Sequence, residues 1–278
     1  MQGRQRHPGG GPGRLAAVSL GPGFPAYLIP QARAALDEAQ VVVGYQTYIG
    51  LVKTLLTHQE VVATGMKDEV QRCRLAIERA RQGQRVALVS SGDASIYGMA
   101  GLVLEICSAQ RLQVAPPEAD KAVDFYLEVI PGVPALAAGA ALLGAPLMHD
   151  FAAISLSDLL TPWEIIEQRL KAAAQADFVI VLYNPQSKKR TWQLGSVRDL
   201  LLGFKDPQTP VGIVRRAMRE GQQTALTNLK AMLDVPVDMQ TIIIVGNSRT
   251  YTYGPYMITP RGYLDKYQVA SGQLTSDR

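Results

Sequence analysis

The sequence predicts an α/β protein, because short apolar strands alternate with helical segments along most of its 278 residues. Helices of about 10–15 residues between successive strands are typical of a mainly parallel sheet. Two of the strands also end in small, glycine-containing loops, one after Leu20 and one after Ser90. Open α/β sheets bind ligands at the carboxyl ends of their strands. We therefore expect these two loops to share one ligand.

The first half of the chain supplies most of this alternation. Apolar segments of strand length lie at residues 15–20, 41–43, 60–63, 85–89 and 124–129. Segments with helical periodicity lie at residues 26–38, 46–56, 67–81 and 96–110. Pro25 is expected to begin the first helix. The last helix is expected shortly after Asp93, which an ordinary strand-to-helix turn would use as an N-cap.

The run Ile130-Pro131-Gly132-Val133-Pro134 interrupts the alternation, and we place a domain junction there. Beyond it, strands are expected at residues 152–156, 178–183, 211–215 and 241–245, helices at 162–174 and 191–202, and an antiparallel strand at 222–226. Thr161 and Glu164 have the spacing of a capping box at the first of these helices. The predicted parts are a disordered leader (1–14), an N-terminal α/β domain (15–131), a C-terminal α/β domain (132–265) and a tail (266–278) that frays after Tyr263.

Composition and charge exclude several classes of function. The chain is 47% hydrophobic and 19% charged, and no apolar run approaches the roughly 20 residues needed to cross a bilayer. We expect a cytoplasmic protein with no membrane partner and no signal peptide. Its two cysteines and three histidines have no metal-ligand or redox spacing, so we expect no metal site. Two basic clusters, 188–190 and 215–219, lack interleaved aromatic residues, which argues against nucleic-acid binding.

The first glycine loop matches the G-x-G-x-x-A pattern of dinucleotide-binding proteins, from Gly21 to Ala26. Pro22 and Pro25, however, remove two backbone N–H groups that would otherwise bind a pyrophosphate. The second strand also ends in Val43-Gly-Tyr, with no carboxylate to hold a ribose hydroxyl. A nicotinamide dinucleotide is therefore disfavoured. The loop suits a ligand without phosphates, such as S-adenosylmethionine (SAM).

The chain resembles the tetrapyrrole methyltransferases of cobalamin biosynthesis from about Gly13 to Tyr263. The resemblance rests on ordered strings: Leu20-Gly-Pro-Gly, Ser91-Gly-Asp-x-x-Ile-Tyr-Gly-Met-Ala, Ile130-Pro-Gly-Val, Leu182-Tyr-Asn-Pro and Ile244-Val-Gly-Asn-Ser. Within that superfamily, longer strings most resemble the family of precorrin-3B C-17 methyltransferases: Val43-Gly-Tyr-x-x-Tyr, Ser90-Ser-Gly-Asp-Ala, Ile154-Ser-Leu-Ser-Asp-Leu-Leu-Thr-Pro-Trp and Leu182-Tyr-Asn-Pro-x-Ser. A single Gly-Pro-Gly is weak evidence, whereas the ordered set is specific.

The resemblance implies two α/β domains of the tetrapyrrole methyltransferase type, with SAM in the interdomain cleft, in a protein that is usually a homodimer. It implies methylation of precorrin-3B or cobalt-precorrin-3 at carbon 17, with ring contraction to precorrin-4. Carried over by position, the cofactor contacts are Pro22, Ser91, Gly92, Asp93, Ile96, Pro134, Ala135, Tyr183, Asn184, Gly212 and Thr241. Pro134 and Ala135 stand where relatives carry a hydroxyl, and Asn184 replaces a common methionine.

The resemblance does not identify the base that ring contraction needs near the carbon-20 hydroxyl. The candidates are Glu69, Asp93, His149 and Tyr48, and each also has an ordinary structural explanation as a surface, capping or core residue. A precorrin carries many carboxylates, which arginine binds well. We therefore expect substrate contacts from Arg190, Arg215, Arg216 and Arg249, against the alternative that they are solvated surface charge.

Three other functions remain open at this stage. The nearest is another precorrin methyltransferase, acting at carbon 11 or carbon 2, because the fold and the SAM loops would be the same. A methyltransferase of this fold acting on rRNA or protein is more distant, since the string from Ile154 to Trp163 favours a tetrapyrrole-sized substrate. A non-catalytic SAM- or corrinoid-binding module is the alternative outside the enzymes.

Overall fold

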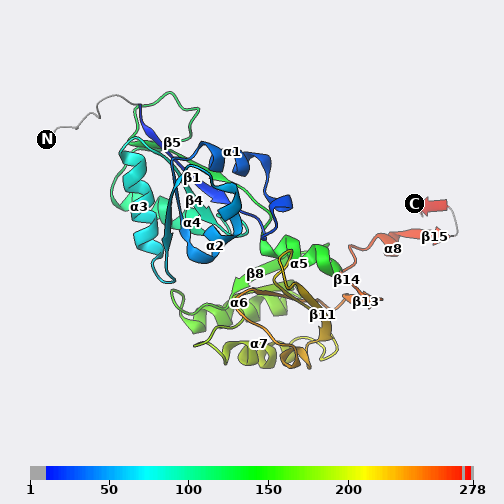
Figure 1. The fold of residues 1–278 in the computed structure, drawn as a ribbon. Helices are drawn as coiled ribbons and strands as arrows, with labels where there is room; N and C mark the ends of the chain where they lie inside the picture. Colours follow the sequence, from blue (N-terminus) through cyan, green and yellow to red (C-terminus); the bar gives the residue numbers. More distant parts are fainter. Residues whose placement is uncertain (1–10, 271–272, 277–278) are drawn as a thin grey trace. The chain divides into compact units, whose positions relative to one another are not determined.

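The computed structural model describes the backbone of residues 11–270 and 273–276, and the side chains of residues 11–267. The chain divides into two compact units, the first ending at Ala135 and the second beginning at Leu136 (Figure 1). Residues 1–10 of the predicted leader and residues 271–272 and 277–278 of the predicted tail lie outside the described residues. Within the described residues, no helix is long and apolar enough to cross a membrane.

Unit 1 is built on a six-stranded parallel sheet with the order β3-β2-β4-β1-β6-β5. Its strands are β1 (Gly13–Ser19), β2 (Val41–Tyr45), β3 (Glu60–Thr64), β4 (Arg85–Ser90), β5 (Val114–Ala115) and β6 (Phe125–Ile130). Its helices are α1 (Pro30–Glu38), α2 (Gln46–Val52), α3 (Glu69–Arg81) and α4 (Met99–Ala109), with short 3-10 turns η1 (Pro25–Tyr27) and η2 (Lys53–Leu55). The predicted parallel α/β organisation is confirmed.

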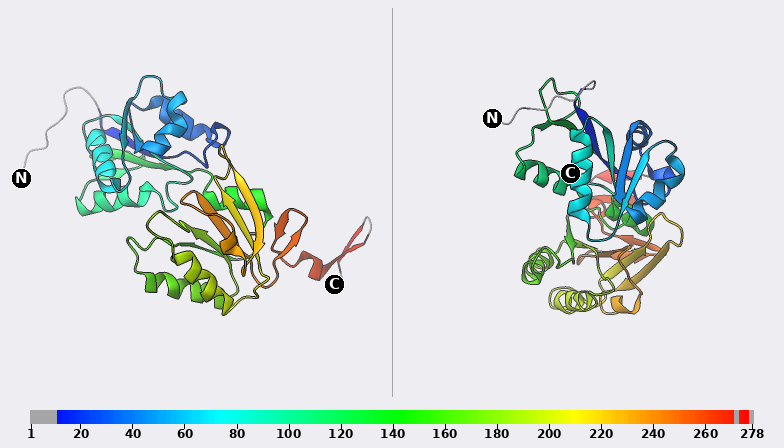
Figure 2. Two further views of the ribbon diagram at one scale, coloured as in Figure 1. Left: turned by 60° about the horizontal axis from the view of Figure 1, so that its bottom comes forward. Right: turned by 60° about the vertical axis from the view of Figure 1, so that its left-hand side comes forward.

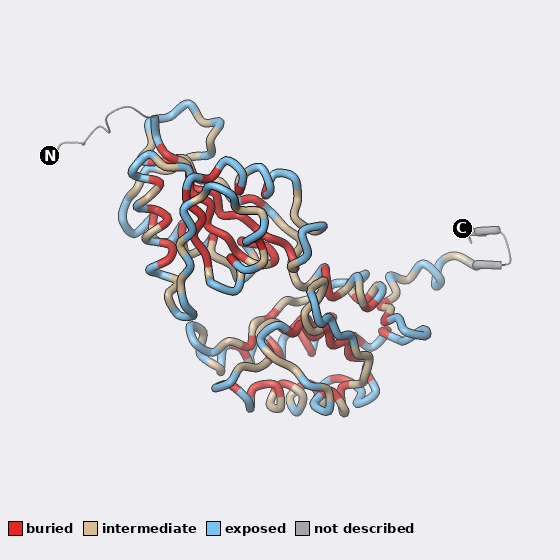
Figure 3. Tube along the Cα trace, in the orientation of Figure 1, coloured by how far each residue is buried: buried red, intermediate tan, exposed pale blue. Residues whose placement is uncertain are grey.

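Helices cover both faces of this sheet. Side chains alternate along each strand, so successive residues enter two different cores. Leu15 of β1 lies in a core cluster with residues of α3 and α4. Val18, three residues further on, lies in the opposite cluster with residues of α1 and α2. Figures 2 and 3 show the helices around the sheet and the buried strands between them. The central strands β1, β2 and β4 are buried along almost their whole length, so their ends are the parts open to a ligand.

Two predicted helix starts in unit 1 are wrong. The first helix begins at Pro30, not at Ala26: Pro25–Tyr27 forms a single 3-10 turn, and Ile29 is extended, as expected of a residue that precedes proline. Helix α4 begins at Met99, not at Ile96, after an extended Gly98. Asp93 therefore does not cap α4, and eight residues, 91–98, separate β4 from the helix.

Unit 2 is built on a mixed five-stranded sheet with the order β11-β10-β12-β9-β8. Its strands are β8 (Phe151–Ser155), β9 (Val179–Tyr183), β10 (Pro210–Arg215), β11 (Gln223–Asn228) and β12 (Thr241–Val245). Strands β8 and β9 are parallel, whereas β12 is antiparallel to both β9 and β10. The predicted antiparallel strand at 222–226 is confirmed as β11, which pairs with β10.

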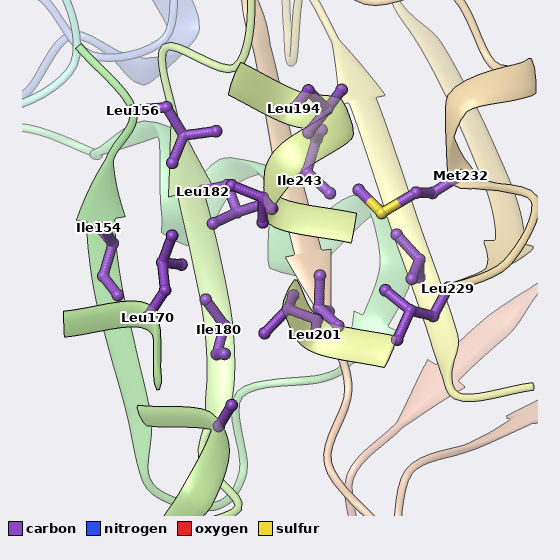
Figure 4. Close-up of a cluster of buried hydrophobic side chains, with 14 of the residues drawn as sticks. Ile154, Leu156, Leu170, Ile180, Leu182, Leu194, Leu201, Leu229, Met232 and Ile243 are labelled. Atoms are coloured by element: carbon purple, nitrogen blue, oxygen red, sulfur yellow. The ribbon is translucent and has the colours of Figure 1, made fainter. Parts of the chain in front are cut away.

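Helices cover both faces of this second sheet. The helices are α5 (Ala135–Leu143), α6 (Trp163–Gln175) and α7 (Gln193–Leu202), with η3 (Met232–Asp234). One face packs on α6, α7 and η3 around the cluster drawn in Figure 4, which includes Ile180 and Ile243. The other face receives α5: a Cβ on Gly139 would lie 2.6 Å from a methyl carbon of Ile242, and one on Gly212 would lie 2.3 Å from a methyl carbon of Leu143.

Three features of unit 2 differ from the sequence predictions. The N-cap of α6 is Pro162 and makes no side-chain capping hydrogen bond, so the capping box at Thr161 is wrong. The apolar run after Pro134 forms α5, which was not predicted. The tail expected to fray after Tyr263 instead forms α8 (Tyr263–Lys266) and the hairpin β15 (Tyr267–Ala270) and β16 (Gln273–Ser276). A small sheet of β7 (Gly144–Ala145), β13 (Tyr251–Tyr253) and β14 (Tyr256–Ile258) completes the unit.

Candidate functional site

Three loops meet at the carboxyl edge of the unit 1 sheet. Strand β1 lies between β4 and β6, so the loops that follow these three parallel strands, at residues 20–24, 91–98 and 131–134, are neighbours. They are rich in glycine, proline and serine and contain no lysine, arginine or histidine. This is the edge at which parallel α/β sheets bind ligands.

The first two loops are joined through their glycine backbones. The Gly21 N–H donates to the Gly92 carbonyl at 3.0 Å, and the Gly92 N–H donates to the Gly21 carbonyl at 2.7 Å. Both glycines have a positive φ, +66° and +68°, which residues other than glycine rarely adopt. A Cβ on Gly132 of the third loop would lie 2.6 Å from the Gly92 carbonyl oxygen. Glycine is therefore required for the close approach of all three loops.

Asp93 links the second loop to the third. Its carboxylate accepts hydrogen bonds from the Ser95 N–H at 2.8 Å, the Ser95 hydroxyl at 2.5 Å and the Gly132 N–H at 3.0 Å. Burial by itself opposes ionisation, but these hydrogen bonds outweigh it and hold the pKa of Asp93 below its usual value. The three loops therefore carry one ionised, nearly buried carboxylate and no cationic side chain.

Most of the cofactor contacts expected in the first half lie together at this edge. Gly92 faces the third loop, since a Cβ there would lie 3.7 Å from the Ala135 nitrogen and 3.8 Å from the Pro134 Cα. Pro22 is buried in the first loop, and Ser91 and Ile96 are half-buried in the second. Sequence reasoning missed Ser19, whose buried hydroxyl accepts the Ala94 N–H at 2.8 Å. Ser19 could have been identified from the sequence, because it is a polar residue near the end of the predicted first strand.

The remaining expected contacts gather at one edge of the unit 2 sheet, with one exception. Tyr183 ends β9 opposite Ser155 of β8, and the Asn184 side-chain amide donates to the Ser155 hydroxyl at 3.0 Å. Thr241 begins the antiparallel β12, so it lies at this same edge, opposite Arg215. Gly212 is the exception, because it lies inside β10, where its missing side chain makes room for Leu143.

The four candidate substrate arginines have four different environments. Arg215 pairs with Asp238 at 2.6 Å, and Arg249 pairs with Asp265 beyond the opposite end of β12. Arg190 is buried, and its guanidinium donates to the Asn184 carbonyl at 2.6 Å. Burial lowers the pKa of Arg190, partly offset by nearby Asp158.

Arg216 is the fourth. It follows β10 in a left-handed conformation, and no described carboxylate lies within ion-pair distance of it. Its buried Nε has no hydrogen-bond partner among the described atoms. The structure therefore brings Arg190, Arg215 and Arg216 to one edge of unit 2 and separates Arg249 from them.

The candidate bases also lie at different edges. Tyr48 and Glu69 lie in the first turns of α2 and α3, which follow the carboxyl ends of β2 and β3 in unit 1. His149 precedes β8 and so lies at the amino end of that strand in unit 2, opposite the edge that carries Tyr183. Asp93 is committed to hydrogen bonds within its own loops.

Beside Glu69 lies a buried arginine that sequence reasoning missed. Arg72, on the first turn of α3, donates to the Thr64 hydroxyl at 2.6 Å and the Gly65 carbonyl at 2.8 Å, and its guanidinium lies 5.8 Å from the ring centre of Tyr45. It fastens the start of α3 to the ends of β2 and β3. The sequence does not indicate that Arg72 is buried, because it lies on an ordinary amphipathic helix.

The comparisons with known proteins agree with the sequence patterns. A family model described as tetrapyrrole (corrin/porphyrin) methylases matches residues 14–233. A protein of Salmonella typhimurium described as a probable cobalt-factor III C(17)-methyltransferase is 51% identical over 249 residues, 90% of this chain and 99% of that protein. A cobalt-factor III methyltransferase of Priestia megaterium is 47% identical over 92% of this chain, which spans only 46% of that longer protein.

Solved structures share the fold. The crystal structure of the methyltransferase CobJ has a TM-score of 0.79 and 36% sequence identity, covering 89% of this chain and all of that one. The uroporphyrin-III C-methyltransferase of Thermus thermophilus, solved in complex with S-adenosylhomocysteine, has a TM-score of 0.63 and 26% identity, covering 84% of this chain and 92% of that one.

Proposed function

Because the chain belongs to the tetrapyrrole (corrin/porphyrin) methylase family, we propose that it transfers a methyl group from SAM to carbon 17 of a tetrapyrrole in cobalamin biosynthesis. The observation that carries the choice of reaction is the 51% identity to a probable cobalt-factor III C(17)-methyltransferase over almost the whole of that protein. Cobalt-factor III is accordingly the first acceptor to test, with metal-free precorrin-3B as the second.

The unit 1 loops suit SAM as the donor. SAM carries a sulfonium and an ammonium group and no phosphate, and these loops present the ionised Asp93 without any cation. A nucleotide phosphate needs free backbone donors or cations, but the N–H groups of Gly21 and Gly92 already donate to each other's carbonyl oxygens. We assign SAM contacts in unit 1 to Pro22, Ser91, Gly92, Asp93, Ile96, Pro134 and Ala135, and in unit 2 to Tyr183, Asn184, Gly212 and Thr241.

The side chains of this chain have mainly to bind and align the two reactants. The sulfonium is already a good leaving group, so positioning and exclusion of water account for most of the catalysis. For the base in ring contraction we favour Glu69, with Tyr48 second, because both follow carboxyl strand ends in unit 1. The low pKa of Asp93 makes it a weak base.

We further propose that the enzyme works in the cytoplasm as a homodimer. The cytoplasmic assignment is supported by Cys73 and Cys107, which are buried and unpaired. The homodimer follows from the family resemblance and is checked by the molar mass in solution, measured by light scattering.

The direct test incubates the purified protein with methyl-labelled SAM and cobalt-factor III, with precorrin-3B in parallel, and follows product mass and absorption spectrum. Uptake of one labelled methyl group with the spectral change of ring contraction is the expected result. Uptake without contraction would indicate a relative that acts at another carbon, such as carbon 11 or carbon 2. Tight binding of S-adenosylhomocysteine without turnover of either tetrapyrrole would reject the proposed acceptor.

A further inference from the structure

Exposed apolar side chains lie at the edge of the unit 2 sheet where β8, β9 and β10 end and β12 begins. Leu159 and Leu160, in the loop between β8 and α6, are 72% and 92% exposed. Trp192, at the start of α7, is 52% exposed, and Met239, just before β12, is 44% exposed. We call these four residues the apolar platform. Large exposed apolar groups gathered at one edge of a sheet commonly mark a binding surface.

Buried groups beneath hold the loops of the platform in place. The Gln193 amide donates to the Asp158 carboxylate at 2.8 Å, which ties the loop after β8 to the start of α7. Leu156 and Leu194, labelled near the upper end of Figure 4, anchor the same two segments in the core. Because Gln193, Leu156 and Leu194 are buried, they attach both loops to the core of unit 2.

Two further contacts reach the platform residues themselves. The ring of Trp192 packs edge-on against Trp163, with 4.8 Å between ring centres. The guanidinium of Arg190 contacts the Met239 sulfur at 3.4 Å and the Asn184 carbonyl at 2.6 Å. The platform is therefore connected to Asn184, one of the residues expected beside the methyl donor.

Two exposed lysines border the platform, together with the carboxylate of Asp158. Lys188 and Lys189, in the loop before Trp192, are exposed, and neither forms an ion pair with a described carboxylate. Asp158, the carboxylate nearest in the chain to Leu159, is already bonded to Gln193. An apolar surface bordered by free lysines is complementary to a flat, apolar molecule with carboxylates at its periphery.

We propose that the apolar platform binds one face of the tetrapyrrole macrocycle, and that Lys188 and Lys189 bind its peripheral carboxylates. This inference rests on the proposed function and deepens it, because it assigns acceptor binding to side chains of unit 2 that are not among the proposed SAM contacts. It also replaces two of the expected clamps: Arg190 acts from below as a positioning residue, and Arg249 plays no part.

The tryptophans provide a specific readout. The chain contains two tryptophans: Trp192 belongs to the platform, and the half-buried Trp163 packs against it. A bound tetrapyrrole absorbs light where tryptophan emits, so cobalt-factor III added to the full chain should quench the intrinsic fluorescence saturably. S-adenosylhomocysteine, which lacks such absorption, should leave most of the emission intact while its own binding is measured by calorimetry.

Two double variants test the two parts of the surface. Leu159→Ser with Leu160→Ser should weaken cobalt-factor III binding at least about tenfold, since two apolar side chains lose their buried contact. Lys188→Glu with Lys189→Glu should weaken it by a similar factor at low ionic strength, and less at high salt. Leu264→Ser on α8 and Lys230→Glu, which lies after the carboxyl end of β11 at the opposite edge of the sheet, are the matched controls and should change nothing.

The outcomes separate this inference from the proposed function. Weaker tetrapyrrole binding by both double variants, with unchanged affinity for S-adenosylhomocysteine, supports the platform and shows that the variants are folded. Normal turnover and normal KM in both double variants would reject the platform and leave the proposed function standing. A wild-type chain that neither methylates cobalt-factor III nor shows quenching would reject both. Retained binding together with loss of a dimer in the leucine variant would identify the surface as an interface between copies of the chain.

Discussion

The carboxyl edges of the two sheets differ in the way they are built. In unit 1 the edge is made of backbone: Gly21, Gly92 and Gly132 approach so closely that no Cβ fits at Gly132, and a single carboxylate, Asp93, joins the loops. In unit 2 the edge is made of side chains, with a buried arginine and exposed leucines, tryptophan and lysines. The three glycine loops of the first edge carry one carboxylate and no cation, whereas the second edge carries exposed apolar side chains and lysines without an ion pair among the described residues.

This difference matches the two reactants of the proposed reaction. A small cationic donor needs a close, oriented backbone and a negative charge, because its reacting methyl group must be placed accurately. A large macrocycle with carboxylates needs area and distributed positive charge. The comparison indicates a division of labour in which unit 1 chiefly orients the donor and unit 2 chiefly selects the acceptor.

The largest expected effect concerns the base. Glu69→Gln should lower kcat for ring contraction by about 100-fold or more, because the amide cannot accept the proton, while the affinity for S-adenosylhomocysteine stays unchanged. Single-turnover kinetics and product spectra measure this. His149→Ala, at the opposite edge of unit 2, is the control and should retain full activity. If instead Glu69→Gln is active and Tyr48→Phe is not, Tyr48 is the base.

The backbone construction of the unit 1 edge is tested at Gly132. Gly132→Ala should lower the free energy of unfolding by about 1–3 kcal/mol and weaken S-adenosylhomocysteine binding at least about tenfold, because the new Cβ would lie 2.6 Å from the Gly92 oxygen. Chemical denaturation and calorimetry give the two quantities. Gly101→Ala on α4, where a Cβ meets nothing within 4 Å, should stabilise the protein. Equal behaviour of the two variants would contradict a close-packed edge.

The role of Asp93 predicts a pH dependence. Its lowered pKa means that the ionised carboxylate stabilises the fold above the ordinary aspartate range and that this stabilisation is lost as pH falls through the folded-state pKa. Asp93→Asn should therefore cost about 1–3 kcal/mol at pH 7 and less below about pH 4. Urea denaturation at both pH values measures the difference. Asp150→Asn, whose side chain is exposed, should cost little at either pH.

The smallest expected effect separates two neighbouring arginines in unit 2. Arg216→Ala should raise the KM for the tetrapyrrole about three- to tenfold, whereas Arg215→Ala should raise it less, because Asp238 already neutralises Arg215. The KM for SAM should stay the same in both. Steady-state kinetics at low and high salt measure both KM values, and the effect on the KM for the tetrapyrrole should shrink at high salt, because salt screens the charge contact. A larger effect from Arg215 would mean that the Asp238 pair opens to admit substrate.

Local sequence was a good guide to the strands and a weaker guide to where helices begin. The apolar runs of β1, β2 and β4 are buried on both faces of a parallel sheet, so their hydrophobicity alone identifies them. Helix starts depend on a few dihedral angles. α1 begins at Pro30, after an extended Ile29, whereas the sequence pattern predicts a start at Pro25. α5 was missed because it packs through Gly139 and alanines, which have no strong helical pattern.

The sequence by itself determined the α/β class, the glycine loops and their order along the chain, because these depend on residue type and spacing. Only the tertiary structure decided which charges are free. Arg215, Arg216 and Arg249 look alike in the sequence, yet two of them face carboxylates that lie 16 or more residues away, Asp238 and Asp265. It also decided that Asp93 joins loops rather than capping α4, and that Leu159 and Leu160 remain exposed. The physical reason is that hydrogen bonds, ion pairs and burial depend on partners that folding brings together from distant parts of the chain.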